Sequence, residues 1–140
     1  MTISKLTAEE IAKHQLLAAF RLWKEGDFLC ALTLAGASEE ILGKRLRRKG
    51  KAPSFDQIKA EIVDIAAKYG TVDSRDEADI GRLINQTRNE LKHYSGDKEI
   101  SFDLRSDAEE MLERAFANYH LLSGVVLSEA AEYWGRPSDA

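Results

Sequence analysis

The chain lacks the residues and runs that mark several easily recognised classes of protein. Cys30 is its only cysteine, which excludes an intrachain disulfide and a thiolate zinc cluster. No stretch approaches the ~20 uninterrupted apolar residues that a membrane-spanning helix needs. The first residues also lack the apolar run and the small-residue cleavage site of a signal peptide. We therefore expect a cytoplasmic protein with no membrane segment.

The overall charge is of the wrong sign for a general nucleic-acid coat protein. The 140 residues include 24 Asp and Glu against 20 Lys and Arg, a formal net charge of −4. The molecule as a whole does not attract a polyanion, so any binding of nucleic acid must come from a local basic patch. The length and the hydrophobic fraction of 44% are those of one globular domain, residues 1–140.

Helix signals dominate the chain, which contains only two prolines. Three expected helix starts have a Ser or Thr followed by Glu three residues later, the signature of a capping box. The expected helices run from Thr7 to about Lys24, from Asp27 to about Lys49, from Ser54 to before Gly70, from Ser74 to about Tyr94, and from Ser106 to about Trp134. The prediction is an all-α protein, an up-and-down bundle of four to five helices.

The fourth expected helix has an unusual polar face. At about 100° per residue, one arc of this helix is apolar. The opposite arc gathers Arg82, Asn85, Gln86, Asn89, Lys92 and His93. This face contains no carboxylate, although acids outnumber bases in the chain. Neutral and cationic donors without a repelling acid suit a bound phosphate. The alternative is a solvated face that is free of acids by chance.

The spacing of Arg88 and His93 indicates a dimer if the pair is functional. Five positions on a straight helix separate two side chains by about 140° and by ~7.5 Å of rise. They are therefore not natural neighbours on one helix. Two copies of the helix that meet around a two-fold axis would bring an arginine and a histidine from each copy into one shared cleft, so we expect a homodimer.

The segment Arg88-Asn89-x-x-x-His93 resembles the motif of HEPN-domain ribonucleases, in which a polar residue follows an arginine and a histidine lies a few positions later. The resemblance extends to the order of helices, and it implies RNA cleavage without a metal or other cofactor. His93 would serve as general base or acid, Arg88 would stabilise the charge on the phosphorane, and Asn89 would orient either group. The alternatives are a histidine that interacts with the helix dipole and an arginine in an ion pair.

The same resemblance implies residues that support the motif. Relatives carry an acid or other polar side chain on an early helix that buttresses the motif arginine, and Glu39 and Glu40 are the candidates here. Asn85 and Lys92 are further supporting candidates from the acid-free face. A solvated helix surface is the alternative for the glutamates.

Other features carry weaker indications. The basic stretch 44–51 could guide RNA phosphates through Arg45, Arg47 and Arg48, or could be a solvated helix end. His14 and His120 have no spaced partner, so no metal site is expected. The aromatic residues at helical spacing are most simply core or dimer contacts; they are Phe20, Trp23, Phe116, Tyr119 and Trp134.

The sequence thus predicts a metal-independent endoribonuclease that leaves a 2′,3′-cyclic phosphate, as a toxin or defence effector, with RNA as substrate. An antitoxin or a nucleotidyltransferase is a possible partner. Tyr94 directly follows His93, whereas toxins paired with a nucleotidyltransferase carry a tyrosine two positions after the histidine. A non-catalytic HEPN-like module that binds a nucleotide or a partner protein is the main alternative, and a helical scaffold without a site is the third.

Overall fold

The computed structural model describes residues 2–68 and 103–137, and all structural statements below concern these residues. They form five helices and no strand, so the prediction of an all-α protein is confirmed for this part of the chain. The helices are α1 (Ala8–Lys24), α2 (Phe28–Arg48), α3 (Ser54–Lys68), α6 (Leu104–Ser123) and α7 (Ser128–Trp134).

The first two helices begin and end where the sequence predicts. The Thr7 hydroxyl accepts a hydrogen bond from the Glu10 backbone N–H at 3.1 Å, and the Asp27 carboxylate accepts one from Cys30 N–H at the same distance. Each bond satisfies a backbone donor that the first turn of a helix leaves without a partner. Both helices end within two residues of a glycine of positive φ, Gly26 or Gly50.

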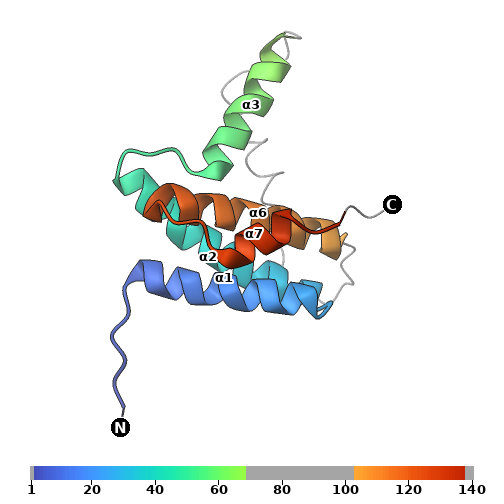
Figure 1. Cartoon of the computed structure of the whole chain (residues 1–140). Coiled ribbons are helices and arrows are strands. Elements are labelled where there is room, and N and C mark those ends of the chain that lie inside the picture. Colours follow the sequence, from blue (N-terminus) through green and yellow to red (C-terminus); the bar gives the residue numbers. More distant parts are fainter. Residues whose placement is uncertain (1, 69–102, 138–140) are drawn as a thin grey trace, which may run out of the picture.

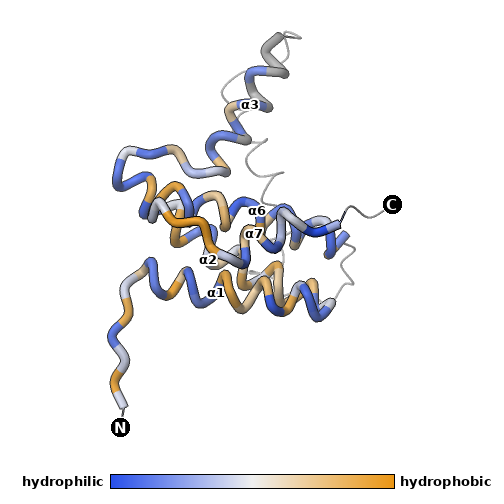
Figure 2. Tube along the Cα trace, viewed as in Figure 1, coloured by the Kyte–Doolittle hydropathy of each residue, from blue (hydrophilic) through white to orange (hydrophobic). Residues whose placement is uncertain are grey.

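Helix α2 lies at the centre of the fold. It packs extensively against both α1 and α6, whereas α1 and α6 contact each other much less. These three helices lie side by side, and α3 rises steeply away from them (Figure 1). Hydrophobic residues recur between hydrophilic ones along α1 and α2, as expected for helices that bury one side (Figure 2).

The core has an aliphatic part and an aromatic part. Leu16, Leu32, Leu42, Leu46 and Leu112 fill the space between α1, α2 and α6, and each is at most 1% exposed. The aromatic part joins α1, α6 and α7. Its ring-to-ring contacts of 5.1–6.0 Å connect Phe20, Trp23, Phe116, Tyr133 and Trp134. Of the predicted aromatic residues Trp134 is half exposed, and the sequence reading missed the fully buried Tyr133.

Helix α6 runs in the same direction as α2. The Arg105 guanidinium lies 5.9 Å from the Phe28 ring at the start of both helices, and Lys51 Nζ donates to the Leu121 carbonyl oxygen near their ends. Neighbouring helices α2 and α6 are therefore parallel, while α1 and α2 are antiparallel (Figure 1). A parallel pair needs a long connection, and residues 49–103 provide one.

The prediction of one long helix from Ser106 to about Trp134 was wrong at its start and in its continuity, although α7 does end at Trp134. Asp103 is the N-cap, and its carboxylate accepts from the Ser106 backbone N–H at 3.1 Å. Gly124 then ends α6 in the left-handed conformation with φ +74°, and Gly124 N–H donates to the His120 carbonyl oxygen. This conformation is easy for glycine, so the chain turns here and starts α7 at Ser128.

Candidate functional site

The residues that carry the ribonuclease prediction lie outside the described residues. These are Arg88, Asn89 and His93, with the supporting candidates Asn85 and Lys92. The structure bears on the two other groups of predicted residues, the glutamates of α2 and the basic stretch at its end.

Glu39 and Glu40 occupy different environments. Glu39 is 5% exposed, and its Oε1 accepts a hydrogen bond from Arg114 Nη2 of α6 at 2.9 Å. Glu40 is only half-buried, and it lies 3.5 Å from Lys44 Nζ one turn further along α2. Of the two candidates, Glu39 is therefore the one whose carboxylate is held inside the protein.

Arg114 is a buried residue that the sequence reading missed. Its side chain is 1% exposed, and its guanidinium lies 4.9 Å from the ring centroid of Phe55 at the start of α3. An arginine can be buried when its charge is balanced and its planar face covers an aromatic ring. A signal was present, since Arg114 lies in the stripe of Met111, Ala115 and Leu122, where a core-facing helix normally carries apolar residues.

Asn118, one turn after Arg114, connects α6 to the start of α3. It is fully buried, and its Oδ1 accepts from the Ser54 backbone N–H at 2.7 Å. The sequence reading made Ser54 the residue that caps this helix, but Ser54 is its first helical residue, and the cap comes from Asn118. The sequence signal was misread because the capping side chain is 64 positions away in the chain.

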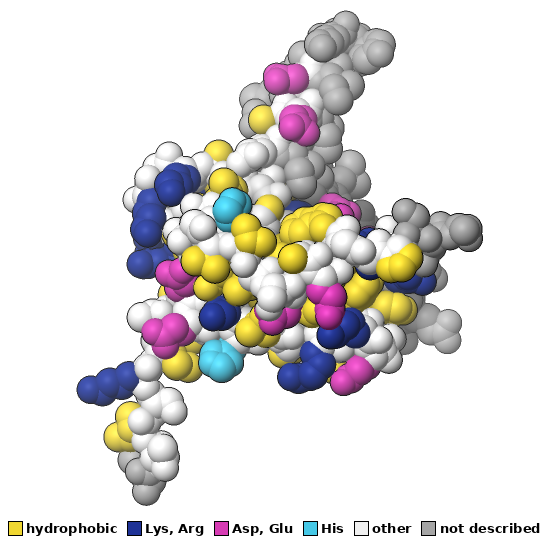
Figure 3. Space-filling view, viewed as in Figure 1, with side chains coloured by type: hydrophobic (Ala, Val, Ile, Leu, Met, Phe, Trp, Pro, Cys, Tyr) yellow, Lys and Arg dark blue, Asp and Glu magenta, His cyan; other side chains and the backbone are white. Residues whose placement is uncertain are grey.

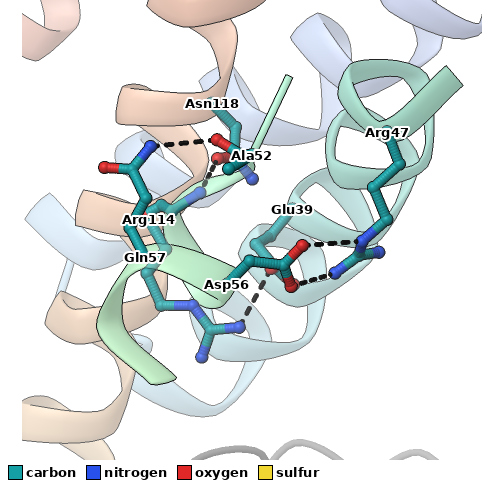
Figure 4. Close-up of polar contacts among 8 residues, drawn as sticks. Glu39, Arg47, Ala52, Asp56, Gln57, Arg114 and Asn118 are labelled. Atoms are coloured by element: carbon teal, nitrogen blue, oxygen red, sulfur yellow. Dashed lines mark hydrogen bonds and ion pairs between the residues drawn. The ribbon is translucent and has the colours of Figure 1, made fainter. Parts of the chain in front are cut away.

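A second pair of charged groups ties α2 to α3. Arg47 binds both carboxylate oxygens of Asp56, with Nε to Oδ2 at 3.1 Å and Nη2 to Oδ1 at 2.7 Å. The hydrogen bond to Asp56 raises the pKa of the Arg47 guanidinium. Figure 4 shows that the Arg47–Asp56 and Glu39–Arg114 contacts lie close together, where α2, α3 and α6 meet.

These contacts make the junction a rigid support. The carboxylate of Glu39 is paired with the Arg114 guanidinium and shielded from solvent. The cluster fixes α6 and the start of α3 against α2. In chemical terms it can position neighbouring segments.

The basic stretch divides into held and exposed side chains. Arg47 is engaged by Asp56, and Lys51 Nζ donates to the Leu121 carbonyl oxygen at 3.3 Å. Arg45 and Arg48 are exposed, and neither makes a salt bridge to a described residue. Of the three arginines predicted to bind RNA, Arg45 and Arg48 have accessible guanidiniums. The guanidinium of Arg47 is already bound by a carboxylate.

The remaining polar features of the described part offer little chemistry. His14 is exposed and lines a shallow pocket of about 300 Å³ along α1 with Glu10, Lys13 and Leu17. Within residues 2–68 and 103–137, His, Cys, Asp and Glu side chains form no group that could hold a metal ion. In the same segments no helix has both the length and the apolar character for crossing a membrane.

Comparison with known proteins leaves the chain without a family assignment. No family model, curated protein or solved structure matches it. The HEPN resemblance therefore rests on the segment from Arg88 to His93 and on the helical architecture.

Proposed function

We propose that this protein is a metal-independent endoribonuclease of the HEPN type. The observation that carries the proposal is the segment Arg88-Asn89-x-x-x-His93, in which Asn89 and His93 fall on the expected acid-free face. One structural observation supports it. The described part of the chain is a helical bundle.

The proposed reaction is attack of a ribose 2′-hydroxyl on the adjacent phosphate. His93 of one copy takes the 2′-hydroxyl proton as the new P–O bond forms, since an imidazole changes protonation near neutral pH. Arg88 stabilises the charge that builds on the phosphorane oxygens. The P–O5′ bond then breaks, and the 5′-oxygen leaves with a proton from water. The products are a 2′,3′-cyclic phosphate and a 5′-hydroxyl.

The direct test is digestion of a mixed RNA pool in EDTA by the purified protein. The His93→Ala variant lacks the general base, so its rate of RNA cleavage should be lower by roughly 10²–10⁴-fold. Loss of the charge-stabilising group in Arg88→Ala should lower it by roughly 10²–10³-fold. His14→Ala and Arg21→Ala are matched controls, because both side chains are exposed on α1.

The proposed dimer has its own test, which uses two inactive variants. A mixture of Arg88→Ala and His93→Ala forms heterodimers whose shared cleft retains one arginine and one histidine, from different copies. Activity should return on mixing if these groups act across the interface. Heterodimers that form and stay inactive would contradict the shared cleft. Wild-type protein that folds, dimerises and leaves every RNA intact would contradict the ribonuclease proposal and favour a binding module.

A further inference from the structure

Basic and aliphatic side chains share one end of the molecule. The basic part comes from the end of α2 and the residues after it, and the aliphatic part from the turn between α6 and α7. We define the basic–aliphatic face by its exposed side chains, which are Lys44, Arg45, Arg48, Lys49, Lys51, Leu121, Val125 and Val126. Figure 3 shows Lys and Arg side chains gathered at the left edge of the molecule, with hydrophobic side chains beside them.

A direct contact joins the two parts of this face. Lys51 Nζ donates to the Leu121 carbonyl oxygen at 3.3 Å, so the chain after α2 lies against the end of α6. The basic and aliphatic side chains are therefore neighbours in the folded protein, although some 70 positions separate them in the sequence.

The turn holds its valines out in a defined position. Ser123 Oγ donates to the Tyr119 carbonyl oxygen at 2.7 Å and accepts from the Val125 backbone N–H at 3.1 Å. Leu127, just beyond, is 8% exposed and anchors the chain in the core. Between these two anchors, Val125 is 51% and Val126 63% exposed. Two valines on an ordered turn are preorganised to bind another apolar surface.

The basic–aliphatic face carries a local excess of positive charge. Residues 44–52 contain six Lys and Arg and no Asp or Glu, and residues 119–127 contain no acid either. Glu40, one turn before, lies 3.5 Å from Lys44 Nζ, and Asp56 of α3 binds Arg47. In a protein of net charge −4, this local excess of positive charge favours an acidic partner.

The aliphatic side chains select among acidic partners. Single-stranded RNA gains its binding energy beyond the phosphates from bases stacked on aromatic rings or guanidiniums. The exposed apolar residues here are two valines and a leucine, and Tyr119 nearby is buried. A helix that lies on a membrane needs a long apolar stripe, whereas this face has one short turn. We propose that the basic–aliphatic face docks an acidic segment of a partner protein that carries aliphatic side chains.

Such a partner would cover Arg45 and Arg48, the exposed guanidiniums assigned to RNA phosphates. The expectation that the partner segment competes with RNA rests on the proposed function. The expectation that the segment docks on this face does not rest on it, so either expectation can fail without the other. Binding is therefore measured without RNA, and ribonuclease activity only afterwards.

The probe is a fluorescein-labelled synthetic peptide with glutamates and leucines at helical spacing, titrated with the full chain and followed by anisotropy. A second peptide has serine in place of every leucine and keeps the charge. We expect the leucine peptide to bind at least roughly tenfold more tightly, because only it can cover the valines. We also expect its binding to weaken with added salt.

Two double variants assign the binding to the face. Val125→Ser with Val126→Ser should weaken binding of the leucine peptide roughly tenfold and leave the serine peptide unchanged. Arg45→Glu with Arg48→Glu should weaken both peptides and reduce the effect of salt. Ile11→Ser with Arg21→Glu is the matched control on α1, where both side chains are exposed. All of these positions are at the surface, and circular dichroism checks that each variant folds.

Three results would overturn the proposal. The first is equal binding of the two peptides, which would leave only a counter-ion effect. The second is binding of the leucine peptide that the valine variant does not weaken. The third is that the leucine peptide does not bind, while an RNA decamer or phosphatidylserine vesicles do bind and the same valine variant abolishes that binding.

Discussion

Replacing Arg114 with methionine tests how the junction of α2, α3 and α6 is held together. The guanidinium lies 2.9 Å from the Glu39 carboxylate, and the two side chains are 1% and 6% exposed. Methionine has a similar length and no charge, so Arg114→Met leaves most of the volume filled. It removes the cation beside a buried carboxylate and the contact with the Phe55 ring.

The expected cost is large because the remaining charge cannot reach water. Removing one partner of a buried ion pair typically costs about 3–5 kcal/mol. With a urea dependence of about 1–3 kcal/mol per molar, the unfolding midpoint should fall by at least about 1 M. Arg105→Met is the control. Arg105 forms an ion pair with Glu109 at 3.0 Å, but its side chain is 52% exposed. An exposed pair in this arrangement contributes only about 0.3–0.5 kcal/mol.

Urea unfolding followed by circular dichroism at pH 7 measures the loss of stability. An unfolding free energy of Arg114→Met within about 1 kcal/mol of wild type would refute the reasoning. That result would mean that Glu39 reaches solvent or a second cation when Arg114 is gone.

Three further predictions concern single contacts. Asn118→Ala removes the acceptor for the Ser54 backbone N–H at the start of α3. The free energy of unfolding should fall by about 1–2 kcal/mol and proteolysis within α3 should become faster, with the exposed Gln57→Ala as the control. Gly124→Ala puts a side chain at φ +74° and should lower the stability measured by thermal unfolding by about 1–2 kcal/mol. Gly124→Asn should lower it by less, and equal stabilities of the two variants would contradict this prediction. Burial raises the pKa of Tyr133 to about 12, so stability should be unaffected by this group below pH 10 and fall from there to about pH 12. Absorbance of tyrosinate should show a late-titrating group that disappears in Tyr133→Phe.

Local signals in the sequence predicted local structure well. Thr7 and Asp27 bond to a backbone N–H three residues later, and such short-range caps can be read without knowledge of the fold. The acidic and apolar pattern between them was enough to place α1 and α2 within a residue or two. The break at Gly124 was also local, but the apolar residues Val125, Val126 and Leu127 beyond it continued the helical pattern and obscured it.

Long-range pairs could not be predicted in this way. The cap of α3 comes from Asn118, and the partner of Glu39 is Arg114, 75 positions away. Neither pairing leaves a signal at the spacing of a single helix. The sequence did show two candidate supporting acids, and only the packing of α2 against α6 distinguishes the buried Glu39 from the half-buried Glu40. The catalytic prediction at Arg88, Asn89 and His93 lies outside the described residues and stays a prediction.

Two consecutive residues of α2 face opposite neighbours. Ser38 Oγ donates to the Ala12 carbonyl oxygen of α1 at 2.7 Å, and Glu39 accepts from Arg114 of α6. An inserted residue between them would turn one half of the helix by about 100° relative to the other and lengthen it by ~1.5 Å. Both bonds could not then form together. Homologous or engineered versions of this protein are therefore expected to keep the number of residues in the middle of α2 unchanged.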